Sequence, residues 1–174
     1  GSLADVKTEA FILAFCEGKK ALSGPAADID RKSGGLLSDI IKSGDFEAKA
    51  SEVLVIYTRG AVPAKRIALV GLGKKSELNL EKIRRAFAKA MQHLRGLKIK
   101  EAATAFDTDL LPDQKEKVVA AIVEGASLGL YQYTPYKTVG REEVKDLRQL
   151  EIIARYADYS WIQDVVQKTN IITD

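Results

Sequence analysis

The sequence is poor in the side chains on which most protein metal sites and nucleophilic active sites depend. It has one histidine, His93, and one cysteine, Cys16, in 174 residues. A protein zinc site needs three or four His, Cys or carboxylate ligands, so a metal site here would have to use carboxylates alone. A Ser-His-acid or Cys-His device would have to use His93 as its base. These side chains offer little material for an enzyme active site.

Other missing features exclude further classes of protein. Four prolines and 13 glycines are too few for a collagen-like or low-complexity chain, and 46% hydrophobic residues are too many for a disordered one. No apolar run approaches the roughly 18 residues of a membrane span. There is no visible secretory leader, and one cysteine allows no internal disulfide. We expect a cytoplasmic protein without membrane contact, whose Gly1-Ser2 start resembles a cloning remnant.

Short apolar segments alternate along the chain with segments of helical periodicity. Strands are expected at 6–15, 53–57, 66–70, 101–106 and 150–154, and helices at 28–32, 36–41, 79–97, 112–130 and from 158 onward. The turn residues 59–63 join two of these strands, which are expected to form a hairpin or to lie side by side. This alternation predicts an α/β domain of three layers, with a mixed β-sheet flanked by helices.

The two long helices each carry one apolar face. In the first, which begins at Asn79, the face comprises Ile83, Phe87, Ala90, Met91, Leu94 and Leu97. In the second, it comprises Val118, Val119, Ile122, Ala126 and Leu130. Gly125 and Gly129 lie inside the second helix, where each costs about 1 kcal/mol relative to alanine. We expect a close approach of this helix to the sheet to compensate for that cost.

A glycine-containing turn, Gly71-Leu72-Gly73-Lys74-Lys75-Ser76, stands between a predicted strand and a predicted helix. This is the setting of a phosphate-binding loop. However, the dinucleotide fingerprint requires a third glycine where this chain has Ser76, and the Walker pattern fails as well. A tight strand-to-helix turn is the interpretation we favour, and an anion site is the alternative.

Two groups of acidic residues are interpreted as structural. Asp28, Asp30 and Gly34 are weakly similar to a calcium-binding loop. However, Lys32 stands where such a loop has a ligand, and Ser33 stands where it has the turn glycine. A solvated helix start explains them better. Asp107 and Asp109 are interpreted as part of a loop that leads into the helix at Pro112.

Positive charge is concentrated in one segment, although the whole chain carries a net charge of only +3. Residues 74–103 hold nine basic and three acidic side chains. The side chains expected on an exposed basic face of the first long helix are Lys74, Lys75, Lys82, Arg85 and Lys89. Such a face can attract nucleic acid through its phosphates. It lacks interleaved aromatic residues, so a solvated helix face or a subunit contact is the more common explanation.

The remaining candidates also have ordinary structural explanations. His93 is expected at or near the surface, with no nucleophile nearby in the sequence. Cys16 is expected to be a small buried hydrophobic residue at the end of a strand. Tyr131, Tyr133 and Tyr136 are expected to cover a sheet edge with their hydroxyl groups in water.

Three segments occur in an order and spacing that resemble those of a known family. They are Ser33-Gly34-Gly35-Leu36-Leu37-Ser38 with Lys42-Ser43-Gly44-Asp45-Phe46; Arg66-Ile67-Ala68-Leu69-Val70-Gly71-Leu72-Gly73-Lys74 with Arg84-Arg85; and Glu124-Gly125 with Leu128-Gly129, Tyr131, Tyr133 and Tyr136-Lys137. No single segment is specific, but together they span about residues 5–172. The chain resembles the N-terminal domain of the leucyl (cytosol) aminopeptidase family.

This resemblance implies a macro-domain-like fold at residues 3–157, with residues 158–174 as the start of a connector helix toward a catalytic domain. In the family, that C-terminal domain binds two divalent metals, zinc or manganese, which position a water to attack the first peptide bond. The family forms cytoplasmic homohexamers. The resemblance therefore implies that this chain has no catalytic, cofactor-binding or metal-binding residue of its own, and that it supports assembly and access to the active site. The implied partners of the whole enzyme are its own C-terminal domain, further subunits and peptide substrates.

Two other functions remain open at this stage. A stand-alone macro-like module would bind a nucleotide or ADP-ribose-type anion, with the 71–75 turn and Ser33–Gly35 as its loops. Alternatively, the basic face within residues 74–103 would bind DNA, although we regard that as the weaker hypothesis.

Overall fold

The structure of the protein is a computed structural model that describes residues 3–18, 21–105, 109–131, 147, 149–154 and 158–173. Its strands are β1 (Ala10–Phe15), β2 (Val53–Tyr57), β3 (Arg66–Gly71), β4 (Glu101–Ala105) and β5 (Gln149–Ile153). Its α-helices are α1 (Gly24–Lys32), α2 (Leu36–Ser43), α3 (Leu80–Gly96), α4 (Lys115–Leu130) and α5 (Tyr159–Thr173). Single 3-10 turns are η1 (Leu3–Asp5), η2 (Lys75–Glu77) and η3 (Pro112–Gln114).

The strands form one mixed sheet in the order β2-β3-β1-β4-β5. β1 runs parallel to both β3 and β4, and β5 runs parallel to β4. β2 is antiparallel to β3, pairing Val53 with Val70 and Tyr57 with Arg66, so of the two arrangements that the sequence left open the hairpin is the one present. The parallel connection from β3 to β4 is made through α3, as a crossover requires.

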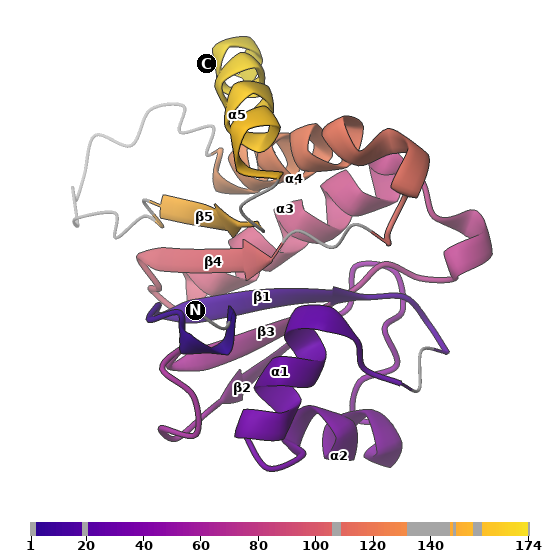
Figure 1. Ribbon diagram of the computed structural model, residues 1–174, viewed down its shortest axis with the longest axis vertical. Helices are drawn as coiled ribbons and strands as arrows, with labels where there is room; N and C mark the ends of the chain where they lie inside the picture. The colour runs from indigo at the N-terminus through magenta and orange to yellow at the C-terminus, as the bar shows by residue number, and fades with distance from the viewer. Residues whose placement is uncertain are drawn as a thin grey trace, which may run out of the picture.

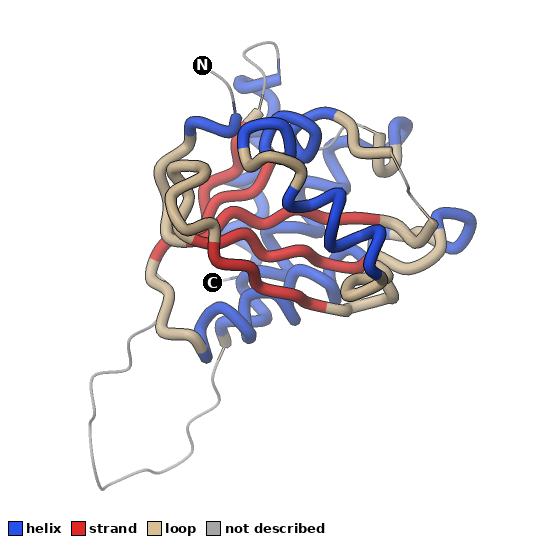
Figure 2. Tube along the Cα trace, turned by 90° about the horizontal axis from the view of Figure 1, so that it is seen from below, coloured by secondary structure: helices blue, strands red, loops and turns tan. Residues whose placement is uncertain are grey.

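The sheet separates two hydrophobic layers, which confirms the predicted three-layer α/β architecture. In Figure 1, α1 and α2 lie in front of the sheet while α3 lies behind it, and Figure 2 shows the sheet between helices on its two sides. Because side chains alternate along a strand, Ile12 of β1 packs toward α3 and α4, and Phe11 packs toward α1 and α2. β1 is therefore almost completely buried, since it is the central strand.

Helix α3 begins where the sequence predicts. The Asn79 side chain accepts a hydrogen bond from the Lys82 backbone N–H (2.9 Å), which satisfies one of the free donors at the helix start. The predicted apolar face is buried from Ile83 to Leu94. Leu97 is an exception, being 40% exposed, and its assignment to the buried face was wrong. The reason is that α3 ends at Gly96, so Leu97 follows the last helical turn.

Gly125 and Gly129 allow α4 to lie close to α3. A Cβ built on Gly125 would be 2.3 Å from the Arg84 carbonyl oxygen, and one on Gly129 would be 2.4 Å from that of Ala88. The compensation for these helical glycines is thus a helix–helix contact, and the expected contact with the sheet was wrong. The two helices run in the same direction. Gly125 of α4 meets Arg84 of α3, and Gly129, four residues later, meets Ala88, which is also four residues later.

Helix α5 follows β5 and rises past α4 (Figure 1). Ile162 is buried, and Trp161, Val165 and Val166 pack partly against the α3–α4 side of the core. No helix among the described residues is long and apolar enough to cross a membrane. The predicted loop at 134–146, Phe106, Asp107, Tyr133 and Tyr136 lie outside the described residues.

Candidate functional site

The end of β1 is the place in this sheet where a ligand site is most expected. In open α/β sheets, ligands bind beyond the carboxyl ends of strands at the point where neighbouring connections leave toward opposite faces. After β1 the chain continues into α1 on one face, and after the neighbouring β3 it continues into α3 on the other (Figure 1).

Two hollows open at this position. One, of about 340 Å³, is lined by Phe15, Cys16, Glu17, Gly18, Ile41, Gly44, Phe46, Glu47, Ala48 and Lys49. The other, of about 350 Å³, is lined by Ala14, Cys16, Glu17, Gly18, Lys75, Asp109 and Leu110. Charges of both signs surround them. The Lys49 ammonium contacts the Glu47 carboxylate, and that hydrogen bond raises the pKa of Lys49. The hollows therefore lack the excess of positive charge that an anion site usually has.

The turn that follows β3 has little capacity to hold a phosphate, because its backbone donors are already used. The N–H groups of Gly71, Leu72 and Gly73 donate to the carbonyls of Glu52 (2.8 Å), Phe15 (2.8 Å) and Ala48 (3.0 Å). A phosphate-binding turn needs such groups to be free. A Cβ on Gly71 would also lie 1.9 Å from the Lys49 carbonyl oxygen. Glycine is needed here for close packing of the 48–52 loop, which favours the structural interpretation of the turn.

Lys75 is held by the backbone of another loop. Its ammonium group donates to the carbonyls of Asp109 (2.5 Å) and Leu110 (2.6 Å). The structure thus brings together two residues, Lys75 and Asp109, that the sequence analysis considered separately. Their contact is with a backbone carbonyl rather than between side-chain charges, and it fastens the start of α3 to the segment before α4.

The second proposed loop, Ser33–Gly35, precedes a helix whose N-terminus is already occupied by a carboxylate. The Asp30 side chain accepts hydrogen bonds from the N–H groups of Leu37 (2.9 Å) and Ser38 (3.0 Å) and from the Ser38 hydroxyl (2.5 Å). Asp30 therefore supplies the negative charge that a helix N-terminus attracts. Sequence reasoning missed this role, since Asp30 belongs to the preceding helix. The only signal was an acidic residue two turns before the start of a glycine-flanked helix.

The basic face of α3 is largely paired within the chain. Lys82 contacts Glu77 (2.8 Å), and Arg85 contacts Glu81 (2.8 Å). These hydrogen bonds lower the pKa values of both carboxyl groups. With Lys75 bound to backbone carbonyls, three of the five predicted basic residues have partners. The face thus attracts phosphates less than the count of basic residues suggests.

His93 and Cys16 are at opposite ends of the sheet. Cys16 follows β1 at the carboxyl ends of the strands, and it is buried as predicted. His93 is exposed in the last turn of α3, which has crossed back to the other end. The topology therefore keeps apart the two side chains that a Cys-His device would need. Of the three tyrosines considered, only Tyr131 is described, and it is 72% exposed at the end of α4.

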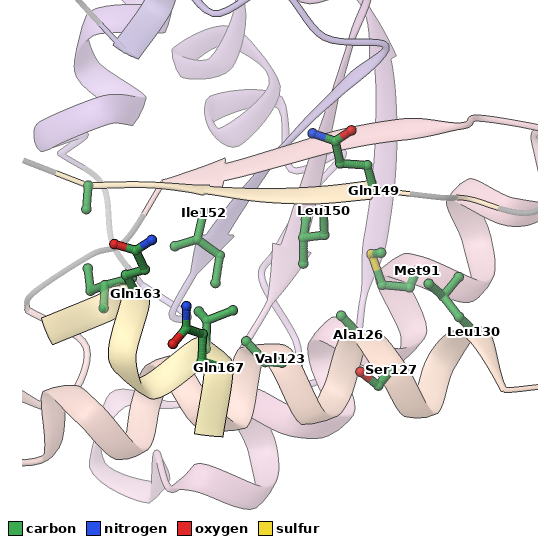
Figure 3. A pocket seen from close by; sticks show the side chains of 13 residues that line it. Met91, Val123, Ala126, Ser127, Leu130, Gln149, Leu150, Ile152, Gln163 and Gln167 are labelled. Atoms are coloured by element: carbon green, nitrogen blue, oxygen red, sulfur yellow. The ribbon is translucent and has the colours of Figure 1, made fainter. Parts of the chain in front are cut away.

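An apolar cavity of about 510 Å³ lies between β5, α4 and α5 (Figure 3). Its lining consists of Met91, Val123, Ala126, Ser127, Leu130, Gln149, Leu150, Ile152, Ala154, Ile162, Gln163, Val166 and Gln167. Leu150 and Ile152 point from the strand toward the helices (Figure 3). The polar members are one hydroxyl and three amide side chains, which do not titrate. This cavity can accommodate apolar groups, but its lining offers no general acid or base.

Comparisons with known proteins decide the family. Residues 12–139 match the model of the cytosol aminopeptidase family, N-terminal domain. The chain belongs to the cytosol aminopeptidase family. It is 32% identical over 154 residues to a protein of Alkaliphilus oremlandii named "Probable cytosol aminopeptidase", covering 87% of this chain and 30% of that protein. It is 30% identical over 171 residues to the "Cytosol aminopeptidase" of Pseudomonas aeruginosa, covering 97% and 34%. The chain thus spans about a third of the length of these relatives.

Solved structures show the same fold. A mutant of tomato leucine aminopeptidase superposes with a TM-score of 0.76 at 20% identity, covering 99% of this chain and 34% of that one. The Oceanobacillus iheyensis macrodomain with ADP superposes with a TM-score of 0.72 at 14% identity, covering 100% and 90%. The predicted macro-domain-like fold of this aminopeptidase domain is therefore confirmed.

The two divalent metals implied by the family do not fit this domain. Across residues 3–105 and 109–173, as far as they are described, no group of three or more His, Cys, Asp or Glu side chains is arranged to hold a metal ion. A divalent metal needs several such ligands around one point.

Proposed function

We propose that this chain is the non-catalytic N-terminal domain of a metal-dependent leucyl aminopeptidase, which removes N-terminal amino acids from peptides. The observation that carries the proposal is the match of this chain to the family's N-terminal domain. In the relatives, about two thirds of the sequence has no counterpart in this chain. We place the two metals, zinc or manganese, and the activated water in that other part.

Residues 158–174 are proposed as the start of a connector toward the catalytic domain, and residues 3–157 as the N-terminal domain proper. Two observations support this division. Helix α5 follows β5, an edge strand among the described strands, and it extends past the helical layer (Figure 1). The proposed partner of this end is the protein's own C-terminal domain.

The proposed role of the domain is to support assembly of a cytoplasmic homohexamer and to shape access of peptides to the active site. Apolar surface near α5 supports that role. Leu128 and Tyr131, at the end of α4, are 58% and 72% exposed and offer apolar area to a neighbouring subunit. The apolar cavity opens between the same helix, β5 and α5.

The coding sequence beyond the codon for Asp174 tests this proposal directly. We expect an open reading frame that continues and encodes a domain rich in Asp, Glu and Lys ligands for two metals. A stop codon immediately after that position would contradict the proposal and would favour the stand-alone module instead.

An ADP-ribose-binding module is the second candidate, supported by the hollows at the end of β1 and the fold shared with macrodomains. The occupied N–H groups of the 71–73 turn count against it. Calorimetric titration with ADP-ribose separates the two functions. We expect no saturable heat at millimolar ligand, whereas a saturable isotherm would establish the module.

DNA binding through α3 is the weaker alternative. It requires an affinity for duplex DNA that decreases with salt and weakens when Lys82, Arg85 and Lys89 are replaced by Glu. Lys82 and Arg85 already pair with Glu77 and Glu81. We therefore expect duplex DNA to retain the wild-type chain and this triple variant equally poorly. Salt-sensitive retention of the wild type alone would support DNA binding.

A further inference from the structure

Strand β2 is an uncharged apolar strand at an edge of the sheet. Its sequence is Val53-Leu54-Val55-Ile56-Tyr57, and among the described strands it pairs only with β3. Its first four residues are partly exposed, and Tyr57 is 59% exposed. Edge strands usually carry a charge, a proline or a bulge that prevents pairing with other chains. None of these features interrupts β2.

The ladder between β2 and β3 determines which backbone groups face outward. The Gly71 N–H donates to the Glu52 carbonyl (2.8 Å), and the Thr58 N–H donates to the Lys65 carbonyl (3.2 Å). In an antiparallel pair, inward-facing and outward-facing residues alternate. Glu52, Leu54, Ile56 and Thr58 therefore direct their backbone groups toward β3. The N–H and C=O groups of Val53, Val55 and Tyr57 point away from the sheet, where they are available to another strand.

Both faces of β2 are already covered within the chain. Val53 and Val55 pack against the α3–α4 side of the core, and Leu54 and Ile56 pack against the α1–α2 side. A strand added at this edge would need helices of its own to cover its two faces. An isolated peptide lacks them, whereas a second copy of this chain brings the same layers with it.

We propose that two copies of this chain associate through β2, with the two strands antiparallel about a two-fold axis at Val55. This register places Val55 opposite Val55 of the second copy, and Val53 opposite Tyr57. All three outward-facing residues then find outward-facing partners, which gives six backbone hydrogen bonds across the axis. The two sheets continue into one sheet that joins the five described strands of each copy.

The charges at the ends of β2 match this antiparallel arrangement. The N-terminal end carries Glu52, and the C-terminal end is followed by Arg59, with Arg66 stacked over the Tyr57 ring at 5.0 Å. Pairing about the two-fold axis brings the acidic end of each strand to the basic end of the other. A parallel pairing would bring like charges together instead.

The expected dimer is weak and reversible. A contact centred on five residues a side lies at the low end of the interface areas found in specific complexes. We therefore expect dissociation in the range of roughly 10 µM to 1 mM. The contact requires nothing from a catalytic domain, so it can fail without affecting the proposed aminopeptidase function.

Sedimentation velocity of the 174-residue chain, from about 10 µM to 1 mM, tests the association. We expect a concentration-dependent dimer. Val55→Pro removes the outward N–H without removing a bond to β3, so it should raise the dissociation constant at least about tenfold, while circular dichroism and the melting temperature confirm folding. A wild-type chain that remains monomeric at 1 mM would overturn the proposal, as would an unaffected dimer of folded Val55→Pro.

Cysteine cross-linking tests the register independently of Val55→Pro. Two residues directly opposite each other in a hydrogen-bonded pair have Cα atoms about 5.5 Å apart, within the range of a disulfide. Oxidised Val55→Cys should therefore form a covalent dimer. Tyr57→Cys is the matched control, because its counterpart in the second copy would be about 13 Å away along the strands. Cross-linking of Tyr57→Cys in preference to Val55→Cys, or of neither variant, would overturn this register.

Discussion

The backbone carbonyl of Arg84 in α3 lies so close to Gly125 in α4 that a Cβ on Gly125 would be 2.3 Å from the carbonyl oxygen. Gly129 has the same relationship to Ala88 one turn later, at 2.4 Å. The Arg84 side chain also pairs with Glu124 (2.5 Å) beside this contact. The two crossover helices, α3 and α4, are therefore packed backbone to backbone. This contact determines how closely the two helices lie together on their side of the sheet.

Replacing Gly125 or Gly129 by alanine should destabilise the domain. The new methyl group meets a backbone carbonyl that cannot move without separating the helices, so we expect a loss of about 3 kcal/mol in the free energy of unfolding. Urea denaturation measures it. Gly96→Ala is the matched control, since a Cβ there meets nothing within 4 Å, and it should be neutral or stabilising. Equal effects of the three substitutions would contradict the packing described.

Asp30→Ala should lower the free energy of unfolding by about 1–2 kcal/mol, because the first N–H groups of α2 lose their acceptor. Thermal and urea denaturation measure this loss. Asp28→Ala is the control, since Asp28 pairs with the exposed Arg31 (2.6 Å), and it should change stability by less than about 0.5 kcal/mol. An Asp30→Ala protein as stable as Asp28→Ala would show that the carboxylate does not cap α2.

Lys75→Met should lower the free energy of unfolding by roughly 0.5–1 kcal/mol, because the ammonium no longer bridges the carbonyls of Asp109 and Leu110. Lys74→Met provides a matched comparison at the neighbouring exposed position and should be close to neutral. If Lys75 instead served an anion, its loss would leave stability unchanged and weaken ADP-ribose binding, which calorimetry would detect.

Glu9 should make the stability of the domain depend on pH. Its carboxylate accepts a hydrogen bond from the Lys100 N–H (2.6 Å), which is the main reason that its pKa is lowered from the ordinary value of 4.5. A lowered folded-state pKa stabilises the protein above the unfolded-state pKa, and this contribution is lost as the pH falls through the folded-state value. Because Glu9 is only partly buried, Glu9→Gln should lower the free energy of unfolding at pH 7 by at most about 1 kcal/mol. The loss should become smaller as the pH falls below the unfolded-state pKa, as measured by urea denaturation at each pH. A loss independent of pH would contradict this explanation.

Local patterns in the sequence were sufficient to predict most of the elements. Asn79 before a helical apolar face, and the turn at 59–63 between two β-branched segments, are local signals that the structure follows. The order β3-β1-β4 in the centre of the sheet depends on contacts between distant segments, so it does not follow from local periodicity.

The missed features of the candidate site share one cause. The role of Asp30 depends on how α1 meets α2, and the saturation of the 71–73 turn depends on the 48–52 loop. Likewise, the glycines of α4 are explained by residues of α3 that lie 41 positions earlier in the chain, and spacing alone does not identify them. Residue types indicate which chemistry is available, while these tertiary contacts determine whether it is already used.

The central claim is that these residues form a folded domain that does not itself carry the aminopeptidase chemistry. Hydrolysis of a leucyl-anilide substrate by the purified 174-residue chain, with zinc or manganese present, tests it most directly, with the proposed longer protein assayed in parallel. We predict metal-dependent turnover by the longer protein and none above the blank by this chain. Metal-dependent turnover by the chain alone would contradict the claim.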